Sequence, residues 1–173
     1  MKNSTSRLLK VLAAIVLVLF IDSVGEAKDA PPDVASALIV KLLAMEKSLS
    51  AGGEVSIHVI GSPALAEAFS KAAGIAIGAA KLGKVTGGDG LPSYKPSVIC
   101  VADAGKVSTV MEYTRREKVA SVTCLQQAVS SGISLGVGIG DDGKPEVLIN
   151  MAASKAEGLN WNLAILKVAK SVG

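Results

Sequence analysis

The stretch Glu54–Gly74, EVSIHVIGSPALAEAFSKAAG, decides the fold. The side chains of its first seven residues point alternately to the two faces of a strand, and both faces carry apolar groups. This pattern is typical of a strand whose two faces are both packed against other parts of the protein. Gly61 and Ser62 then supply a turn and a hydroxyl that can cap a helix, and Pro63 suits the first helical position. A strand, a tight turn and a capped helix form the first half of a βαβ unit, which predicts a largely parallel sheet.

The rest of the chain continues this alternation of strands and helices. Residues 75–82 fit either a helix or a buried strand, and Val85 suits a short edge strand. Asp142-Gly143 between two apolar runs predicts a hairpin. We therefore expect a single Rossmann-like α/β domain with a mixed, mostly parallel sheet flanked by helices, a C-terminal hairpin strand pair and a closing helix. The remaining predicted strands are 97–102, 119–123, 133–139 and 147–149, and the helices between them are 106–118 and 125–129.

Two further helices are predicted at the ends of the domain. The opening helix begins near Asp33, whose side chain can cap it, and ends at Gly52. The closing helix begins at Leu163, and Leu166 and Ala169 are expected to lie in the core because they recur at helical spacing. The residues expected to share the inner face of the opening helix are Val34, Leu38, Leu42, Met45 and Leu49.

Residues 1–27 have the pattern of a secretory signal peptide. Basic residues precede the apolar run Val11–Ile21, and Gly25 and Ala27 form the small-x-small pair expected before cleavage. The run is shorter than the roughly 20 residues that cross a bilayer, so an uncleaved anchor is the weaker alternative. We expect a periplasmic protein, cleaved after about Ala27, in which residues 31–173 form the folded domain.

The mature chain has nearly balanced charge. Residues 28–173 contain 15 basic and 13 acidic side chains, a net charge near +2, and aromatic residues make up 3% of the whole sequence. A nucleic-acid-binding surface needs a basic excess, which is absent here. The length is enough for one domain with a single core.

No catalytic or cofactor motif is evident. His58 is the only histidine, so a Ser-His-Asp triad or a histidine-rich metal site has no pattern to support it. Gly136, Gly138 and Gly140 resemble a nucleotide loop, but a hairpin follows them where a helix is required. We interpret them as strand glycines that allow close packing. The sequence predicts a non-enzyme without a cofactor or a metal ion.

Five residues are candidates for a ligand crevice or a disulfide. His58, Gly61 and Ser62 lie at the carboxyl end of the first strand, where open α/β sheets bind ligands. The alternatives are a hydrogen-bonded structural histidine and an ordinary helix cap. Cys100 and Cys124 lie in neighbouring strands, where export permits a disulfide, and the alternative is a pair of buried free thiols.

Asn160, Trp161 and Asn162 are the candidates for binding a partner. Trp161 is the only tryptophan and lies in the loop before the closing helix. A half-exposed tryptophan in a loop can anchor a partner protein, whereas the alternative is a large aromatic ring that plugs the end of the core.

The C-terminal region contains four short motifs, Ile149-Asn150, Ala153-Ser154-Lys155-Ala156, Gly158-Leu159 and Leu166-Lys167-Val168-Ala169. Together they resemble the closing motif of the YfiR-like family of periplasmic signalling regulators. The resemblance extends more loosely back to Pro31. It implies a regulator that holds an inner-membrane diguanylate cyclase inactive through contact with its periplasmic sensor domain, which lowers cyclic di-GMP, and it implies a possible homodimer.

The chain departs from this family in two places. Its opening helix carries Leu38-Ile39-Val40 and Leu42-Leu43 where family members carry several aromatics, and the family's cysteines do not fall at Cys100 and Cys124. Redox control is therefore not implied. A periplasmic small-ligand-binding module is the main alternative to a regulator, and a structural envelope component is a third.

Overall fold

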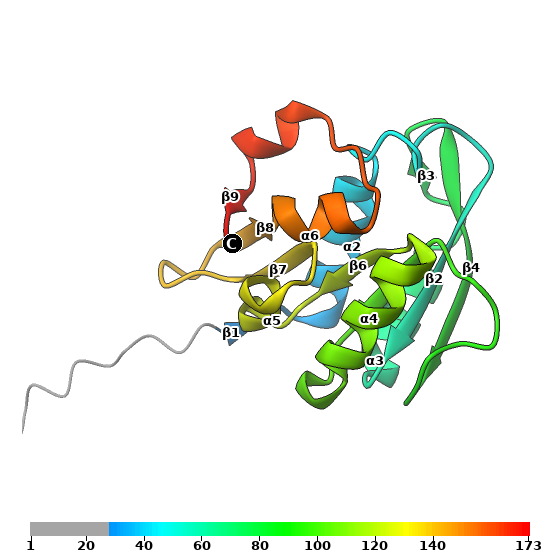
Figure 1. Ribbon diagram of the computed structural model, residues 1–173, viewed down its shortest axis with the longest axis horizontal. Helices are drawn as coiled ribbons and strands as arrows, with labels where there is room; N and C mark the ends of the chain where they lie inside the picture. Colours follow the sequence, from blue (N-terminus) through cyan, green and yellow to red (C-terminus); the bar gives the residue numbers. More distant parts are fainter. Residues whose placement is uncertain (1–27) are drawn as a thin grey trace, which may run out of the picture.

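The computed structural model describes residues 28–173 and shows one mixed sheet of nine strands with helices on both faces (Figure 1). The predicted signal peptide lies outside the described residues. The strand order is β3-β4-β2-β5-β6-β7-β8-β9, and β1 pairs with β7. The strands are β1 (Lys28–Asp29), β2 (Glu54–Ile60), β3 (Ala76–Ile77), β4 (Ala80–Gly88), β5 (Val98–Val101), β6 (Ala120–Thr123), β7 (Leu135–Ile139), β8 (Pro145–Ile149) and β9 (Lys170–Ser171).

Five central strands, β4, β2, β5, β6 and β7, are parallel. β3 and β8 run antiparallel to their neighbours β4 and β7, and β9 is parallel to β8. The chain passes from β2 to β4 on one side and returns to β5 on the other, so the direction of winding reverses between β2 and β5. The predicted α/β class, the mostly parallel sheet and the hairpin are confirmed.

Helices cover both faces of the sheet, with α4 and α5 on the near side and α2 behind in Figure 1. The larger core cluster joins α2 and α3 to one face of the sheet, and a second cluster joins α4 and α5 to the other. Within residues 28–173, no helix is long and apolar enough to span a bilayer. The helices are α2 (Pro32–Leu43), α3 (Pro63–Lys71), α4 (Val107–Glu117), α5 (Gln126–Ser131) and α6 (Met151–Ala156), with 3-10 helices η1 (Ala104–Lys106) and η2 (Leu163–Lys167).

The first βα unit forms as its sequence predicts. Ser62 caps α3, because its hydroxyl accepts a hydrogen bond from the backbone N–H of Leu65 at 3.2 Å. Gly61 has a φ of 83° and lies against the loop after β5, where an added Cβ would stand 2.5 Å from Cβ of Asp103. The loops that follow β2 and β5 therefore pack directly on each other, and only a glycine fits between them.

Of the two expectations for residues 75–82, the strand is confirmed and the helix is wrong, and the strand that contains Val85 is longer than the short edge strand expected. Residues 75–88 contain a two-residue strand, β3, and a nine-residue strand, β4, which pairs in parallel with β2. The Gly78 turn between them has a φ of 64°, which suits a tight reversal. This turn lies against Ser50, whose Cβ would stand 2.7 Å from a Cβ added at Gly78.

The opening helix is shorter than predicted. α2 ends at Leu43, and its N-cap residue is Pro31, so the predicted cap by Asp33 is wrong. The chain leaves the helix because the buried carboxylate of Glu46 accepts hydrogen bonds from the hydroxyl of Ser48 and the N–H of Leu49, which closes a turn. The inner face is also shifted, since Val34 is exposed and the buried residues are Ala35, Ser36, Ile39, Val40, Leu42 and Leu43.

The predicted closing helix is wrong. Residues 163–167 form the 3-10 helix η2, and the chain then extends to pair β9 with the free edge of β8. Pairing with the sheet edge overrides the helical spacing of this segment. Leu166, expected in the core, is 46% exposed, whereas Ile165 and Ala169 are buried.

Gly61→Ala should lower the free energy of unfolding by about 2–4 kcal/mol, because the new methyl group meets Asp103 and the left-handed backbone disfavours alanine. Gly90→Ala is the matched control, since no atom lies within 4 Å of its Cβ position, and should change stability by less than about 0.5 kcal/mol. Urea unfolding of both variants measures the difference. Equal stability would show that the two loops are not in close contact.

Candidate functional site

The C-terminal segment after α6 is fixed by the buried carboxylate of Glu46. Its Oε1 atom accepts a hydrogen bond from the N–H of Asn160 at 2.8 Å. The backbone on either side of Glu46 also pairs with this segment: the N–H of Lys47 donates to the carbonyl of Asn160, and the N–H of Asn162 donates to the carbonyl of Met45. Residues 160–162 are therefore fixed by backbone hydrogen bonds of the kind that join neighbouring strands, together with one hydrogen bond to a buried carboxylate.

A second buried carboxylate, that of Glu157, anchors the end of α6. It accepts hydrogen bonds from the hydroxyls of Thr114, Ser121 and Ser134 at 2.7, 2.6 and 2.5 Å, and from the N–H of Ser121 at 3.0 Å. Burial raises the pKa of Glu157 and the hydroxyl hydrogen bonds lower it in part, with a net rise. One side chain thus joins α6 to α4, to β6 and to the residue before β7.

Trp161, whose backbone pairs with Glu46, is buried in the larger core cluster. Its side chain is 6% exposed, and its indole N–H donates a hydrogen bond to the hydroxyl of Ser154 on α6 at 3.0 Å. The expectation of a half-exposed Trp161 is wrong, because the ring belongs to the larger core cluster. Asn160 and Asn162 are exposed, and the side chain of Asn162 caps η2 by accepting from the N–H of Ala164.

The outer side of η2 carries apolar side chains in contact with solvent. Leu163, Leu166 and Val168 are 76%, 46% and 52% exposed, and they are three of seven exposed large apolar residues in the described chain. Side chains three residues apart in a 3-10 helix lie in line, so Leu163 and Leu166 project together. They lie directly after the predicted partner-binding residues 160–162.

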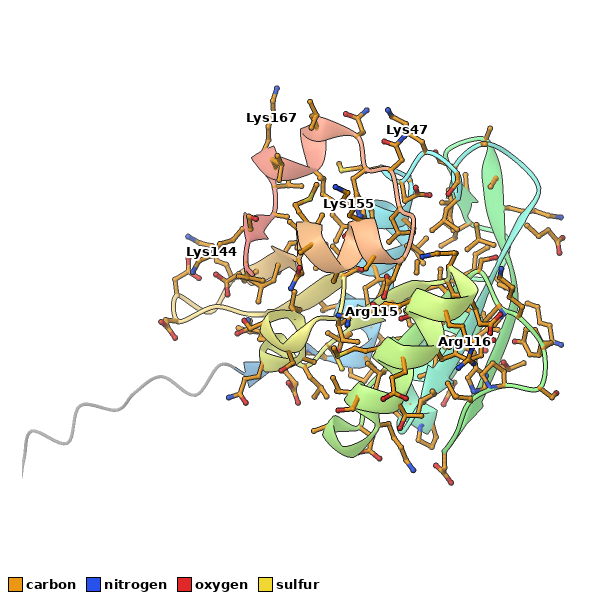
Figure 2. The ribbon with its side chains drawn as sticks, in the orientation of Figure 1. Lys47, Arg115, Arg116, Lys144, Lys155 and Lys167 are labelled. Carbon is orange, nitrogen blue, oxygen red and sulfur yellow. The ribbon has the colours of Figure 1, made fainter. Side chains whose placement is uncertain are left out.

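Positive charges lie around this apolar segment. Figure 2 shows Lys47, Lys155 and Lys167 at the end of the molecule that carries α6 and η2. None of the three forms an ion pair within residues 28–173. The acidic neighbours Glu46 and Glu157 are turned inward and buried. We refer to Leu163, Leu166 and Val168 with these three lysines as the C-terminal face.

The predicted crevice at His58, Gly61 and Ser62 is closed. His58 is 6% exposed, with Nδ1 2.7 Å from the hydroxyl of Thr86 and Nε2 2.9 Å from the carbonyl of Gly90. Both ring nitrogens are thus occupied within the protein. Gly61 contacts the next loop and Ser62 caps α3, so the structural alternatives describe all three residues.

The two cysteines carry free thiols. Cys100 is buried in β5, and Cys124 is half-buried after β6. Burial raises the pKa of both thiols; Cys124 adds to the effect on Cys100, and Asp29 adds to that on Cys124. Two neutral thiols, rather than a disulfide, occupy these positions. Within residues 28–173, no group of three or more histidine, cysteine or acidic side chains is placed to hold a metal ion.

The strand glycines pack as interpreted. A Cβ at Gly136 would overlap the side chain of Val129, and one at Gly138 would overlap Gln126. α5 therefore lies close against β7, which leaves no room for a nucleotide phosphate at these glycines.

Sequence reasoning missed both carboxylates and the three exposed apolar residues. Glu46 and Glu157 are single acidic residues in apolar segments, and such residues are usually solvated. A weak signal was available for Glu157. It precedes Gly158 at the carboxyl end of a short helix, where a negative charge is unfavourable because that end of the helix dipole is itself negative. Leu166 was predicted to be buried because the apolar residues among 163–172 recur at helical spacing, although its side chain is exposed.

Comparisons with known proteins identify the architecture only. No protein-family model matches the chain, and no curated protein matches it. A conserved domain protein from Vibrio cholerae O1 biovar El Tor aligns with a TM-score of 0.50 at 16% identity, over 83% of this chain and 60% of that chain. The ABC domain from Streptococcus pneumoniae in complex with L-Trp aligns with a TM-score of 0.54 at 15% identity, with the same coverage. The chain thus spans about 60% of the length of these neighbours, which share its fold.

The raised pKa of Glu157 predicts a pH-dependent stability. The folded state holds the proton more tightly than the unfolded state, so this contribution is full below the unfolded pKa, about 4.3, and is lost as the pH rises through the folded value. Glu157→Gln removes the titration. In urea unfolding from pH 4 to pH 7, the wild-type protein should lose stability relative to Glu157→Gln. Parallel curves for the two proteins would contradict the desolvation of this carboxyl.

Trp161→Ala should lower the free energy of unfolding by about 3–5 kcal/mol, because it leaves a large cavity in the core. Trp161→Phe keeps most of the apolar contact and loses the hydrogen bond to Ser154, so it should cost about 1–3 kcal/mol. Urea unfolding followed by circular dichroism measures both. A neutral Trp161→Ala variant would mean that the ring is not part of the core.

Proposed function

We propose that this chain is an exported regulatory protein that binds a partner protein through its C-terminal face. The observation that carries the proposal is the exposure of Leu163, Leu166 and Val168 on an anchored backbone. Exposed apolar groups on a rigid support are typical of binding surfaces, because little conformational freedom is lost when a partner covers them. The anchoring by Glu46 and Glu157 supplies that rigidity.

The charge of the C-terminal face selects the kind of partner. Lys47, Lys155 and Lys167 form a positive edge on the side of α6 and η2, whereas Asp141, Asp142 and Glu146 of the hairpin line a hollow with Val168. The complementary surface is apolar at its centre and acidic where it meets the three lysines.

The resemblance to the YfiR-like family supports a specific partner class. We propose an inner-membrane diguanylate cyclase whose periplasmic sensor domain carries the acidic surface. Repression follows if the regulator binds the inactive conformation more tightly than the active one, because equal binding to both states would shift nothing. Cyclic di-GMP inside the cell would then fall when the regulator is bound.

The small-ligand alternative no longer has the crevice at His58 to support it. The structural neighbour from S. pneumoniae is described in complex with L-Trp. At 15% identity, the similarity to that protein supports a shared fold and not a shared ligand. The feature that favours a ligand role is a groove of about 490 Å³ between α4 and α5, on a different part of the molecule.

The double variant Leu163→Asp/Leu166→Asp should weaken binding to the periplasmic sensor domain of the cyclase by at least about 30-fold, because two anchors are lost at the centre of the interface. Ile75→Asp is the matched control, since Ile75 is 52% exposed on the far side of β4 from this face. Isothermal titration calorimetry with the purified sensor domain measures both affinities, and circular dichroism checks that both variants fold.

Cyclic di-GMP levels test the same proposal in cells. Deletion of the gene should raise cyclic di-GMP, wild-type protein and Ile75→Asp should restore the low level, and Leu163→Asp/Leu166→Asp should not. Unchanged cyclic di-GMP after deletion would rule out a cyclase as the target. Full complementation by the double variant would rule out the C-terminal face.

A further inference from the structure

A groove between α4 and α5 lies at the carboxyl ends of β5 and β6. η1 leads from β5 into α4, and Leu125 leads from β6 into α5, so both walls of the groove begin at this end of the sheet. Its volume is about 490 Å³, within the range of small-molecule sites. The lining residues that matter for binding are Asp29, Val107, Ser108, Met111, Leu125 and Gln127.

One wall of the groove is α5, which packs closely against β7. Val129 and Gln126 fill the spaces that Cβ atoms would occupy at Gly136 and Gly138, so α5 lies deep on β7. The wall contributed by α4 has a small side chain, Ser108, where a larger one would bridge to α5. The groove runs between the two helices, from Val107 and Gln126 at their beginnings to Met111 in α4 and Ser131 at the end of α5.

The lining of the groove combines an apolar floor with polar walls. Val107 is buried, Met111 and Leu125 are half-buried, and the unbranched thioether of Met111 can adapt to ligands of different shape. Ser108 and Gln127 add neutral hydrogen-bonding groups on the two walls. Such a lining accommodates a molecule with an apolar part and a polar part.

The charge in the groove comes from Asp29. It is the one ionisable residue among the lining residues, and no lysine or arginine of residues 28–173 forms an ion pair with it. β1 fixes its position, because Asp29 pairs with Gly138 beside the carboxyl end of β7. A carboxylate at the mouth of an apolar groove favours a positive charge on the ligand.

We propose that the α4–α5 groove binds a small organic cation, with its ammonium group at Asp29 and its apolar part on Val107, Met111 and Leu125. The site is separate from the C-terminal face, and this inference does not depend on a protein partner. The groove lies at the carboxyl ends of the parallel strands, whereas the hydroxyls of Ser121 and Ser134 that Glu157 binds lie near or just before the amino ends of β6 and β7.

A titration with 2-phenylethylammonium tests the proposal, with phenylacetate as the probe of opposite charge. Two-dimensional ¹H–¹⁵N NMR on the purified protein should show saturable shifts at Ser108, Met111 and Gln127 at millimolar probe concentrations. Phenylacetate should bind at least about tenfold more weakly. Asp29→Asn should weaken binding of the cation by roughly fivefold, the size of an exposed ion pair.

Ser108→Trp provides a steric test, because Ser108 is exposed and the larger ring fills the groove without entering the core. This variant should fold and should lose the saturable shifts. The proposal is overturned if 2-phenylethylammonium causes no saturable shift up to about 10 mM, the fragment-affinity range. It is equally overturned if phenylacetate binds as well, if the shifts lie away from α4 and α5, or if both variants bind like the wild type.

Discussion

The buried carboxylate of Glu157 is the interaction on which the C-terminal half of the structure depends. It collects four hydrogen bonds from Thr114, Ser121 and Ser134, and so connects α4, β6 and the start of β7 to the end of α6. A buried charge without a counter-ion is unfavourable unless its hydrogen bonds are satisfied. Because these donors come from separate elements, the carboxylate is stable only when all of them are in place.

The position of α6 determines how the remaining chain is presented. Ser154 on α6 holds the indole of Trp161, and Glu46 holds Asn160 from the opposite side, so the segment leaving α6 has little freedom. η2 follows directly and turns Leu163 and Leu166 toward solvent. The same contacts that bury two acidic groups therefore leave an apolar surface that is flanked by Lys47, Lys155 and Lys167 on one side and by the acidic hairpin residues beside Val168 on the other.

Much of the fold could be predicted from the sequence. The alternation in β2, the cap at Ser62 and the turn at Gly143 are local signals, and the structure forms the elements they predict. The errors lie where distant contacts override local pattern: Glu46 ends α2 early, and the edge of β8 draws residues 170–171 into a strand. The candidate site was found only in part. Residues 160–162 mark its position, but the burial of Trp161 depends on Ser154 and on core packing that no local pattern records.

Amide hydrogen exchange on the free protein is the most direct test of this account. The N–H groups of Ser121 and Asn160 donate to the two buried carboxylates, so both should exchange as slowly as the amides of β5, through global unfolding only. Exchange of Asn160 at the rate of Asp141 in the exposed hairpin turn would contradict the account, because the C-terminal face would then lie on a mobile segment.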